Sequence, residues 1–193
     1  TGGNKLFEDK IFKTNIPGLF LINAKKFEDG RGLFLKIFEF EFFQKLGLET
    51  NFMEDFFSIS KKNVLRGLHF QIPPMDHVKV VYCSFGKIFD VVVDLRIGSP
   101  TYGKAETFEL SPESGLVLYI PKGLAHGFLT LSEMAVVNYK VSTKHSPEHD
   151  KGILWNSVDI DWPVNEPILS QRDRNFPKLC EYKSPFIYKE ETK

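Results

Sequence analysis

The chain has 193 residues and a mass of 22.2 kDa; 42% of its residues are hydrophobic and 26% are charged. This size suits one domain with a sizeable core. Its 25 basic and 25 acidic residues cancel, which argues against binding to nucleic acid or an anionic membrane through a general basic field. No apolar run approaches the roughly 20 residues of a membrane-spanning helix. The two cysteines, Cys83 and Cys180, do not make a disulfide framework, so we predict a cytoplasmic protein.

Short runs rich in phenylalanine and β-branched residues recur along the chain. Residues 33–41 alternate like a strand, and residues 42–48 are typical of one or two helical turns closed by Gly47. Further strand-like runs follow at residues 64–71, 78–84, 88–95, 105–110, 116–120, 126–132 and 135–141. Proline and glycine turn signals separate them, and this spacing indicates a β-sandwich or barrel.

The character of the sequence changes after about residue 146. The rest of the chain carries both tryptophans and several prolines but no long periodic run. We therefore predict an all-β core over residues 4–146 and, in the same domain, a helical and loop-rich extension over residues 147–193. The extension should wrap the barrel, with Trp155 and Trp162 as buried anchors. Thr1-Gly2-Gly3 is interpreted as a cloning remnant and left out of the fold.

A charged residue and an imidazole interrupt the apolar run at residues 64–71. Strict alternation would put Arg66 and His69 on opposite faces of a strand. Gly67 lies between them, and a glycine inside a strand often marks a bulge that redirects its neighbours. With a bulge, both side chains could face the barrel interior. The alternative is an edge-facing arginine and a structural histidine.

Other polar residues also fall within strand-like runs. Lys79 shares a face with apolar neighbours, so an inward-facing ammonium is possible. Asp90, together with Asp94 and Arg96, lies on one face of its run, which by itself favours a solvated outer face. Tyr139 would ordinarily be a core residue. His126 follows a Pro-Lys-Gly turn, which places it at the mouth of a strand.

Histidines in a β-barrel raise the alternative of a metal site. Such sites commonly pair two histidines one residue apart on a strand, with a carboxylate close behind. His69, His77 and His126 show no such pair. We therefore predict no metal.

Several spaced motifs occur in order between about residues 18 and 175. They are Phe27-Glu28-Asp29-Gly30-Arg31-Gly32-Leu33-Phe34, Arg66-Gly67-Leu68-His69-Phe70-Gln71, Lys79, Asp90-Val91-Val92-Val93-Asp94-Leu95-Arg96, Ser99-Pro100-Thr101-Tyr102-Gly103, Ile120-Pro121-Lys122-Gly123-Leu124-Ala125-His126-Gly127-Phe128, Tyr139-Lys140, Trp155-Asn156, Trp162-Pro163 and Leu169-Ser170-Gln171-Arg172-Asp173. Together they resemble the dTDP-4-dehydrorhamnose 3,5-epimerases. The resemblance implies a cupin-type jelly-roll barrel, a homodimer that exchanges strand contacts, a nucleotide-sugar substrate, and no metal or organic cofactor.

The resemblance also implies roles for individual residues. In this family a base removes a proton beside the ketone of a nucleotide-linked 4-keto-6-deoxy sugar, and the resulting enolate is reprotonated on the other face. His69 aligns with the base and Tyr139 with the acid. Asp173 aligns with the carboxylate that would hold the Nδ1–H of His69 and leave Nε2 free. Lys79 would stabilise the developing oxyanion.

Substrate-binding positions follow from the same motifs. Arg66 and Arg31 match positions that hold the pyrophosphate, for which a planar guanidinium is well suited. His126 matches a polar contact in the pocket, and Asp90 is expected to fix Lys79 or His69. Phe34 and Gln71 belong to matched motifs and are also expected to bind substrate.

The departures from the family pattern concern recognition. Glu54 and Phe56 stand where the family usually has Gln-x-Asn, and His145 stands where an aromatic usually stacks on thymine. We count all three among the substrate-binding residues. Because the catalytic residues persist while these positions differ, the sequence points to another sugar nucleotide. Close relatives in the family act on GDP-linked 4-keto heptoses of capsule pathways, so the resemblance favours a GDP-linked 4-keto-6-deoxy heptose, inverted at C3 or at C3 and C5.

Three alternatives remain. One is dTDP-4-keto-6-deoxyglucose as substrate, as in rhamnose synthesis. Another is a 3,4-ketoisomerase, which would use the same histidine base. The third is a sugar-nucleotide binding module that has lost the reaction, although binding alone needs no base and acid on opposite faces.

Overall fold

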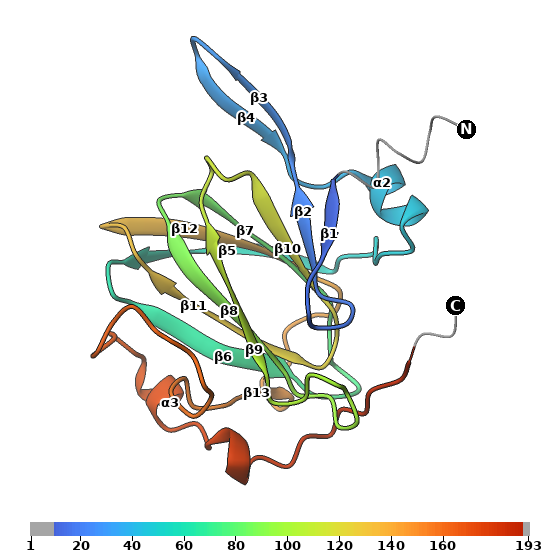
Figure 1. Ribbon diagram of the computed structural model, residues 1–193, viewed down its shortest axis with the longest axis vertical. Coiled ribbons are helices and arrows are strands. Elements are labelled where there is room, and N and C mark those ends of the chain that lie inside the picture. The colour runs from blue at the N-terminus through green and yellow to red at the C-terminus, as the bar shows by residue number, and fades with distance from the viewer. Residues whose placement is uncertain (1–9, 191–193) are drawn as a thin grey trace.

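The computed structural model describes residues 10–190, and two antiparallel sheets face each other in it (Figure 1). The first sheet has the order β1 (Ile11–Lys13), β2 (Phe20–Asn23), β10 (Leu116–Ile120), β7 (Lys79–Phe85), β12 (Met134–Val141) and β5 (Glu54–Lys61). The second has the order β13 (Asp150–Gly152), β6 (Leu65–Gln71), β11 (Leu124–Thr130), β8 (Ile88–Asp94) and β9 (Ala105–Leu110). The prediction of an all-β barrel is confirmed. The predicted domain limits at residues 4 and 193 lie outside the described residues, and so does Thr1-Gly2-Gly3.

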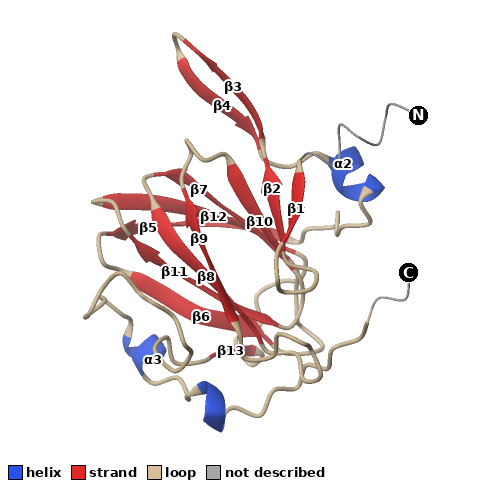
Figure 2. Cartoon of the chain, viewed as in Figure 1, coloured by secondary structure: helices blue, strands red, loops and turns tan. Residues whose placement is uncertain are grey.

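The remaining elements lie outside the two sheets (Figure 2). β3 (Lys25–Asp29) and β4 (Gly32–Lys36) form a separate hairpin that projects from the barrel. α2 (Phe40–Lys45) lies beside the first sheet. α3 (Gln171–Arg174) and the 3-10 helix η1 (Leu179–Glu181) belong to the C-terminal segment, which runs along the outside of β6 and β13.

Three apolar clusters hold these layers together. The central cluster fills the space between the sheets with side chains such as Val81, Leu118 and Phe128. The segment around α2 covers the outer face of the first sheet through residues such as Phe43. The C-terminal segment covers the outer face of the second sheet, where Ile153 packs with Leu68. A sheet covered on both faces explains why β8 and β11 are buried along almost their whole length.

Most of the predicted strands agree with the structure to within about two residues. The predicted strand at residues 33–41 is wrong in its second half, because β4 ends at Lys36 and α2 begins at Phe40. Five strands were not predicted: β1, β2, β3, β13 and the longest of them, β5. β5 lies at the edge of its sheet, and Phe56 and Phe57 are both exposed although they point to opposite faces. Its sequence therefore lacks the apolar–polar alternation by which a strand is recognised.

The tryptophans anchor the extension less deeply than predicted. Both are half-buried rather than buried. Their rings meet edge to face with centroids 5.8 Å apart, and Trp162 also meets Phe89 of β8 at 5.6 Å. Trp162 therefore lies at the rim of the third cluster, and the buried anchors of the extension are Ile153 and Phe186.

The predicted bulge in β6 is present at Gly67. His126 pairs with His69 and Phe128 pairs with Arg66, so two residues of β6 oppose the single residue Gly127. A Cβ on Gly67 would lie 2.7 Å from the Cα of Gly127. Glycine at this point therefore allows the close approach of two strands and turns Arg66 onto the same inner face as His69.

Candidate functional site

The histidine of β6 is paired with a carboxylate from the C-terminal segment. His69 Nε2 lies 2.8 Å from Asp173 Oδ1 on α3. The other oxygen of Asp173 accepts the backbone N–H of Gly67 at 3.0 Å, and the Asp173 N–H donates to the Ser170 side chain. Burial by itself raises the pKa of Asp173, but the hydrogen bond and charge interaction with His69 outweigh it and hold this pKa below its usual value. The carboxylate is therefore a fixed anion behind the imidazole.

The ring nitrogens have the opposite assignment to the one predicted. We expected Nδ1–H to face Asp173 and Nε2 to act as base. The structure places Nε2 on the carboxylate, which leaves Nδ1 as the nitrogen available to a substrate. Which ring nitrogen meets Asp173 depends on the side from which α3 packs against β6. The sequence alone does not predict that packing.

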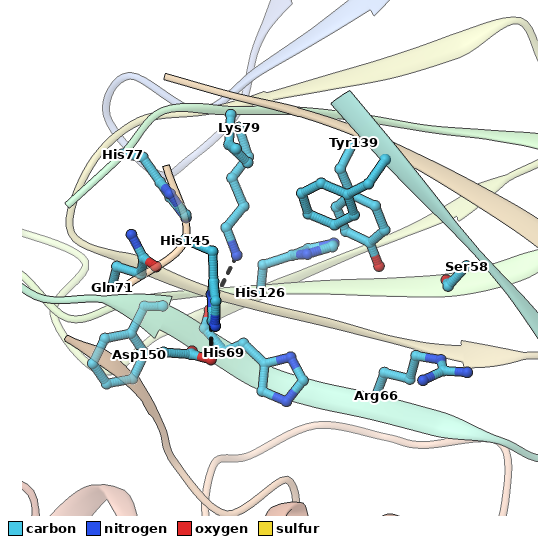
Figure 3. Close-up of a pocket in the computed structure, with 13 residues that line it drawn as sticks. Ser58, Arg66, His69, Gln71, His77, Lys79, His126, Tyr139, His145 and Asp150 are labelled. Atoms are coloured by element: carbon cyan, nitrogen blue, oxygen red, sulfur yellow. Dashed lines mark hydrogen bonds and ion pairs between the residues drawn. The ribbon is translucent and has the colours of Figure 1, made fainter. Parts of the chain in front are cut away.

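His69 opens onto a cavity of about 280 Å³ between the sheets (Figure 3). Eight of the predicted site residues line it, namely Phe56, Arg66, His69, Gln71, Lys79, His126, Tyr139 and His145. Figure 3 shows the Tyr139 hydroxyl and the Lys79 amine pointing into this space from the sheet opposite His69. The cavity thus brings a base, a cation and a phenol from two sheets together.

Lys79 is a buried cation, and no carboxylate between residues 10 and 190 is in ion-pair contact with it. Its side chain is directed at the His69 carbonyl oxygen, at a distance of 3.5 Å, and only 8% of the residue is exposed. Burial lowers the pKa of Lys79 to about 8, although the negative charges of Asp150 and Asp90 oppose the shift. An ammonium whose charge is not neutralised in place is suited to stabilise negative charge that develops on a substrate.

Asp90 contacts His126 directly, and its negative charge also acts on Lys79 without an ion-pair contact. Its Oδ2 lies 2.8 Å from His126 Nε2, and both residues are almost fully buried. Asp90 lies behind the cavity wall, so the expected contact of this side chain with substrate is wrong. The polar face of its strand points inward rather than to solvent: Asp94 is also buried and accepts two hydrogen bonds from the Arg96 guanidinium and one from the Arg96 backbone N–H.

Tyr139 is held in the cavity wall by its aromatic neighbours. Its ring stacks on Phe56 of β5, with centroids 4.8 Å apart and an interplanar angle of 16°. The ring of His126 meets it edge to face at 6.0 Å. Burial raises the pKa of Tyr139, and the nearby charge of Asp90 adds to the shift, so the phenol keeps its proton at neutral pH.

A second pocket of about 350 Å³ adjoins the first and includes Glu54 and His145. Glu54 Oε1 accepts the backbone N–H of His145 at 3.0 Å. Gln71 lines both pockets, but its amide is occupied by backbone groups: it donates to Met75 O at 2.7 Å and accepts from the Ser146 N–H at 2.8 Å. Gln71 therefore shapes the pocket by tying two loops together.

Arg31 and Phe34 are not in this cavity. Both lie on the projecting β3–β4 hairpin, where they line a separate hollow. Arg31 is paired with Asp29 at 2.6 Å, and Phe34 is 59% exposed. The predicted role of these two residues in binding substrate therefore does not involve the His69 cavity of the same chain.

Five residues that line the cavity were not predicted as substrate contacts, namely Ser58, Phe70, His77, Val141 and Asp150. Asp150 begins β13 and pairs with Arg172 at 2.9 Å. No pattern distinguishes it from other acidic loop residues. His77 was considered only as a metal ligand. Burial, with a further contribution from the charge of Lys79, lowers the pKa of His77 to about 3, so this imidazole is neutral.

Within residues 10–190, no group of three histidine, cysteine, aspartate or glutamate side chains is placed to hold a metal ion. No helix in the same part of the chain is long and apolar enough to cross a membrane.

Known proteins match this chain along most of its length. The family model of dTDP-4-dehydrorhamnose 3,5-epimerase matches residues 13–181. A relative of that name from Sinorhizobium fredii is 41% identical over 97% of this chain and 98% of its own. A dTDP-4-dehydrorhamnose 3-epimerase from Streptomyces niveus is 37% identical over 86% of this chain and 82% of its own. A solved dTDP-6-deoxy-D-glucose-3,5-epimerase from Legionella pneumophila, in complex with dTDP-4-keto-L-rhamnose, superimposes with a TM-score of 0.88 at 37% identity, covering 93% of this chain and 99% of that one.

The fold and the matches define an isomerase that acts on nucleotide sugars, built on a cupin-type jelly-roll barrel. The chain belongs to the dTDP-4-dehydrorhamnose 3,5-epimerase family.

Proposed function

We propose that this protein is a cofactor-independent epimerase of a dTDP-linked 4-keto-6-deoxy sugar, inverting C3 and C5. The observation that carries the proposal is one cavity with the His69–Asp173 pair on β6 and Tyr139 and Lys79 on the opposite sheet. Inversion at carbon needs a base on one face of the sugar and an acid on the other, and this arrangement supplies both.

The chemistry begins at the carbon beside the ketone. His69 takes the proton from that carbon, and the electron pair of the broken C–H bond moves through the C4 carbonyl to leave an enolate oxygen. Asp173 stabilises the imidazolium that forms, as a buried carboxylate does for a catalytic histidine. The Lys79 ammonium faces the developing oxyanion, and one such stabilising group is typically worth about 10²–10³ in rate.

The second proton transfer completes the inversion. Tyr139 gives its proton to the carbon from the other face, the enolate returns to a ketone, and the phenolate regains a proton from solvent. The buried phenol stays protonated until the basic enolate is present. Arg66 lines the same cavity, and its planar guanidinium can donate two hydrogen bonds to a pair of pyrophosphate oxygens.

The identity of the nucleotide is proposed from the relatives. The sequence alone favoured a GDP-linked heptose, because Glu54, Phe56 and His145 depart from the family pattern. The relatives that cover this chain are described as acting on dTDP sugars, which supports the dTDP alternative instead. Calorimetry with dTDP and GDP side by side tests the choice, and tighter binding of GDP would contradict it.

We also propose that the enzyme is a homodimer. The β3–β4 hairpin extends beyond the barrel with Phe27 and Phe34 about half exposed. A second copy that covers this apolar surface would bring Arg31 to a neighbouring cavity, which accounts for the family match of a residue so far from its own pocket. Both cysteines are free, in agreement with the proposed cytoplasmic location.

Incubation with dTDP-4-keto-6-deoxyglucose in D₂O tests the reaction itself. We expect two deuterium atoms in the product by mass spectrometry, one each at C3 and C5, and inverted centres by NMR. A single deuterium would restrict the reaction to one carbon. Migration of the carbonyl would identify a ketoisomerase and overturn the proposal.

A further inference from the structure

The ring of Phe56 covers one face of the proposed acid. Phe56 on β5 and Tyr139 on β12 are direct cross-strand partners in the antiparallel register. Their rings are stacked nearly parallel, with centroids 4.8 Å apart and an interplanar angle of 16°. Stacked aromatic pairs at this separation have a preferred geometry, so each ring restricts the rotation of the other.

The other contacts of Tyr139 come from the Ser58 side chain, which lies on β5 as Phe56 does and interacts with the phenol, and from His126. On another side the edge-to-face contact with His126 is longer, at 6.0 Å. His126 is itself fixed by Asp90 and is almost fully buried. Within residues 10–190, β5 is the last strand of its sheet, and no further strand of that range lies beyond Phe56. The stacked ring is therefore the outer wall that keeps Tyr139 turned inward.

Phe56 also lies between the cavity and solvent. It lines both the catalytic cavity and the adjoining pocket, while 45% of its surface is exposed. The Phe56 ring therefore shields the Tyr139 phenol from water. It carries no group that could take part in the reaction.

We infer that Phe56 is a positioning residue that holds Tyr139 in the orientation from which it reprotonates the substrate. This inference rests on the proposed function. A displaced phenol would leave proton removal by His69 intact and impair only the return of a proton to the opposite face. Loss of the Phe56 ring should thus uncouple hydrogen exchange from inversion.

The test compares Phe56→Ala with Phe85→Ala. Phe85 is a similarly exposed phenylalanine of the same sheet, 55% exposed, and it lines neither pocket. With dTDP-4-keto-6-deoxyglucose in D₂O, we expect Phe56→Ala to lower the rate of inversion about 10- to 100-fold, as misplaced groups do, with exchange by His69 nearly retained. Phe85→Ala should match the wild type, and Phe56→Tyr, which keeps the ring, should restore inversion.

A double-mutant cycle separates positioning from a general structural effect. If Phe56 acts through Tyr139, then Phe56→Ala added to Tyr139→Phe should cause little further loss of inversion. Fully multiplicative effects, or an equal fall in exchange and inversion, would overturn the inference. A rise in KM with unchanged kcat would also overturn it, because it would make Phe56 a substrate contact.

A readout without substrate distinguishes this inference from the proposed function. Ultraviolet difference titration gives the ionisation of the Tyr139 phenol by subtraction of the matching Tyr139→Phe variant. We expect Phe56→Ala to bring the pKa of Tyr139 down toward its ordinary value, and Phe85→Ala to leave it unchanged. An unchanged titration in Phe56→Ala would refute the inference, whereas failure of the wild type to convert the dTDP sugar would refute only the proposed function.

Discussion

His69 Nε2 lies 2.8 Å from Asp173 Oδ1, although 104 residues separate the two in the chain. The short helix α3 holds the carboxylate against the outer side of β6, so a residue of the extension orients a side chain inside the barrel. We predict that Asp173→Asn lowers kcat about 10²–10⁴-fold, because the amide no longer stabilises the imidazolium. Steady-state kinetics check this result. Asp159→Asn, an exposed change in the same extension, is the control, and wild-type kcat in Asp173→Asn would exclude the pairing from catalysis.

The second prediction concerns the separation of the two proton transfers. Tyr139→Phe removes the acid and leaves the His69–Asp173 pair in place. We therefore expect hydrogen exchange at the carbon beside the ketone to continue while inverted product falls at least about 10²-fold. Mass spectrometry and NMR of the same reaction measure the two outcomes. His69→Asn should abolish both, and a normal yield of inverted product from Tyr139→Phe would remove the tyrosine from the mechanism.

The third prediction follows from the buried ammonium of Lys79. Its pKa is about 8 in the folded protein, against 10.5 for an ordinary lysine. At pH 7 both folded and unfolded states carry the proton, so the folded state bears the full cost of burying the charge. As pH rises from about 8 to 10.5, the folded state loses the proton first, the unfolded state binds more protons, and wild-type stability increases.

Lys79→Met removes that cost together with the catalytic cation. We expect the variant to be inactive, yet more stable than the wild type at pH 7 by up to roughly 3 kcal/mol, the limit that the pKa difference sets. The advantage should shrink as pH rises above about 8. Urea unfolding at several pH values measures it, and a variant less stable than the wild type at pH 7 would contradict the charge-burial argument.

The fourth prediction tests the bulge in β6. In Gly67→Ala the new Cβ would lie 2.7 Å from the Cα of Gly127 and 3.0 Å from the His126 carbonyl oxygen, at a φ of +137°. Backbone atoms must then move, and we expect a loss of about 2 kcal/mol or more in stability together with loss of activity. Gly30→Ala is the matched control, because no atom lies within 4 Å of its Cβ position. Thermal unfolding of the two variants gives the comparison.

The fifth prediction tests the exchange of hairpins between subunits. If Arg31 serves the cavity of a partner subunit, a mixture of Arg31→Ala and His69→Asn chains should form hybrid dimers in which one of the two sites is intact. Random reassociation of equal amounts should then restore about a quarter of the wild-type activity. Each variant alone should remain poorly active. The absence of any gain after subunit exchange would place Arg31 outside the site.

The sequence predicted much of the barrel because burial imposes alternation on strands. Lys79 and Tyr139 were placed on the faces they occupy, and Gly67 indicated a bulge because a glycine inside a strand often marks one. The structure adds the physical reason, which is the close approach of Gly67 to Gly127. Strand β5 escaped prediction because, at the open edge of its sheet, its apolar side chains are exposed and follow no alternation.

What the sequence by itself determined is the all-β fold, the family, and the set of residue types that line the cavity, since these depend on local pattern and on ordered motifs. Only the tertiary structure decided which nitrogen of His69 meets Asp173, that Asp90 serves His126, and that Arg31 stands outside its own cavity. These relationships depend on where the extension and the hairpin pack against the barrel. Such packing brings together residues far apart in the chain, and the local periodicity of apolar residues does not predict it.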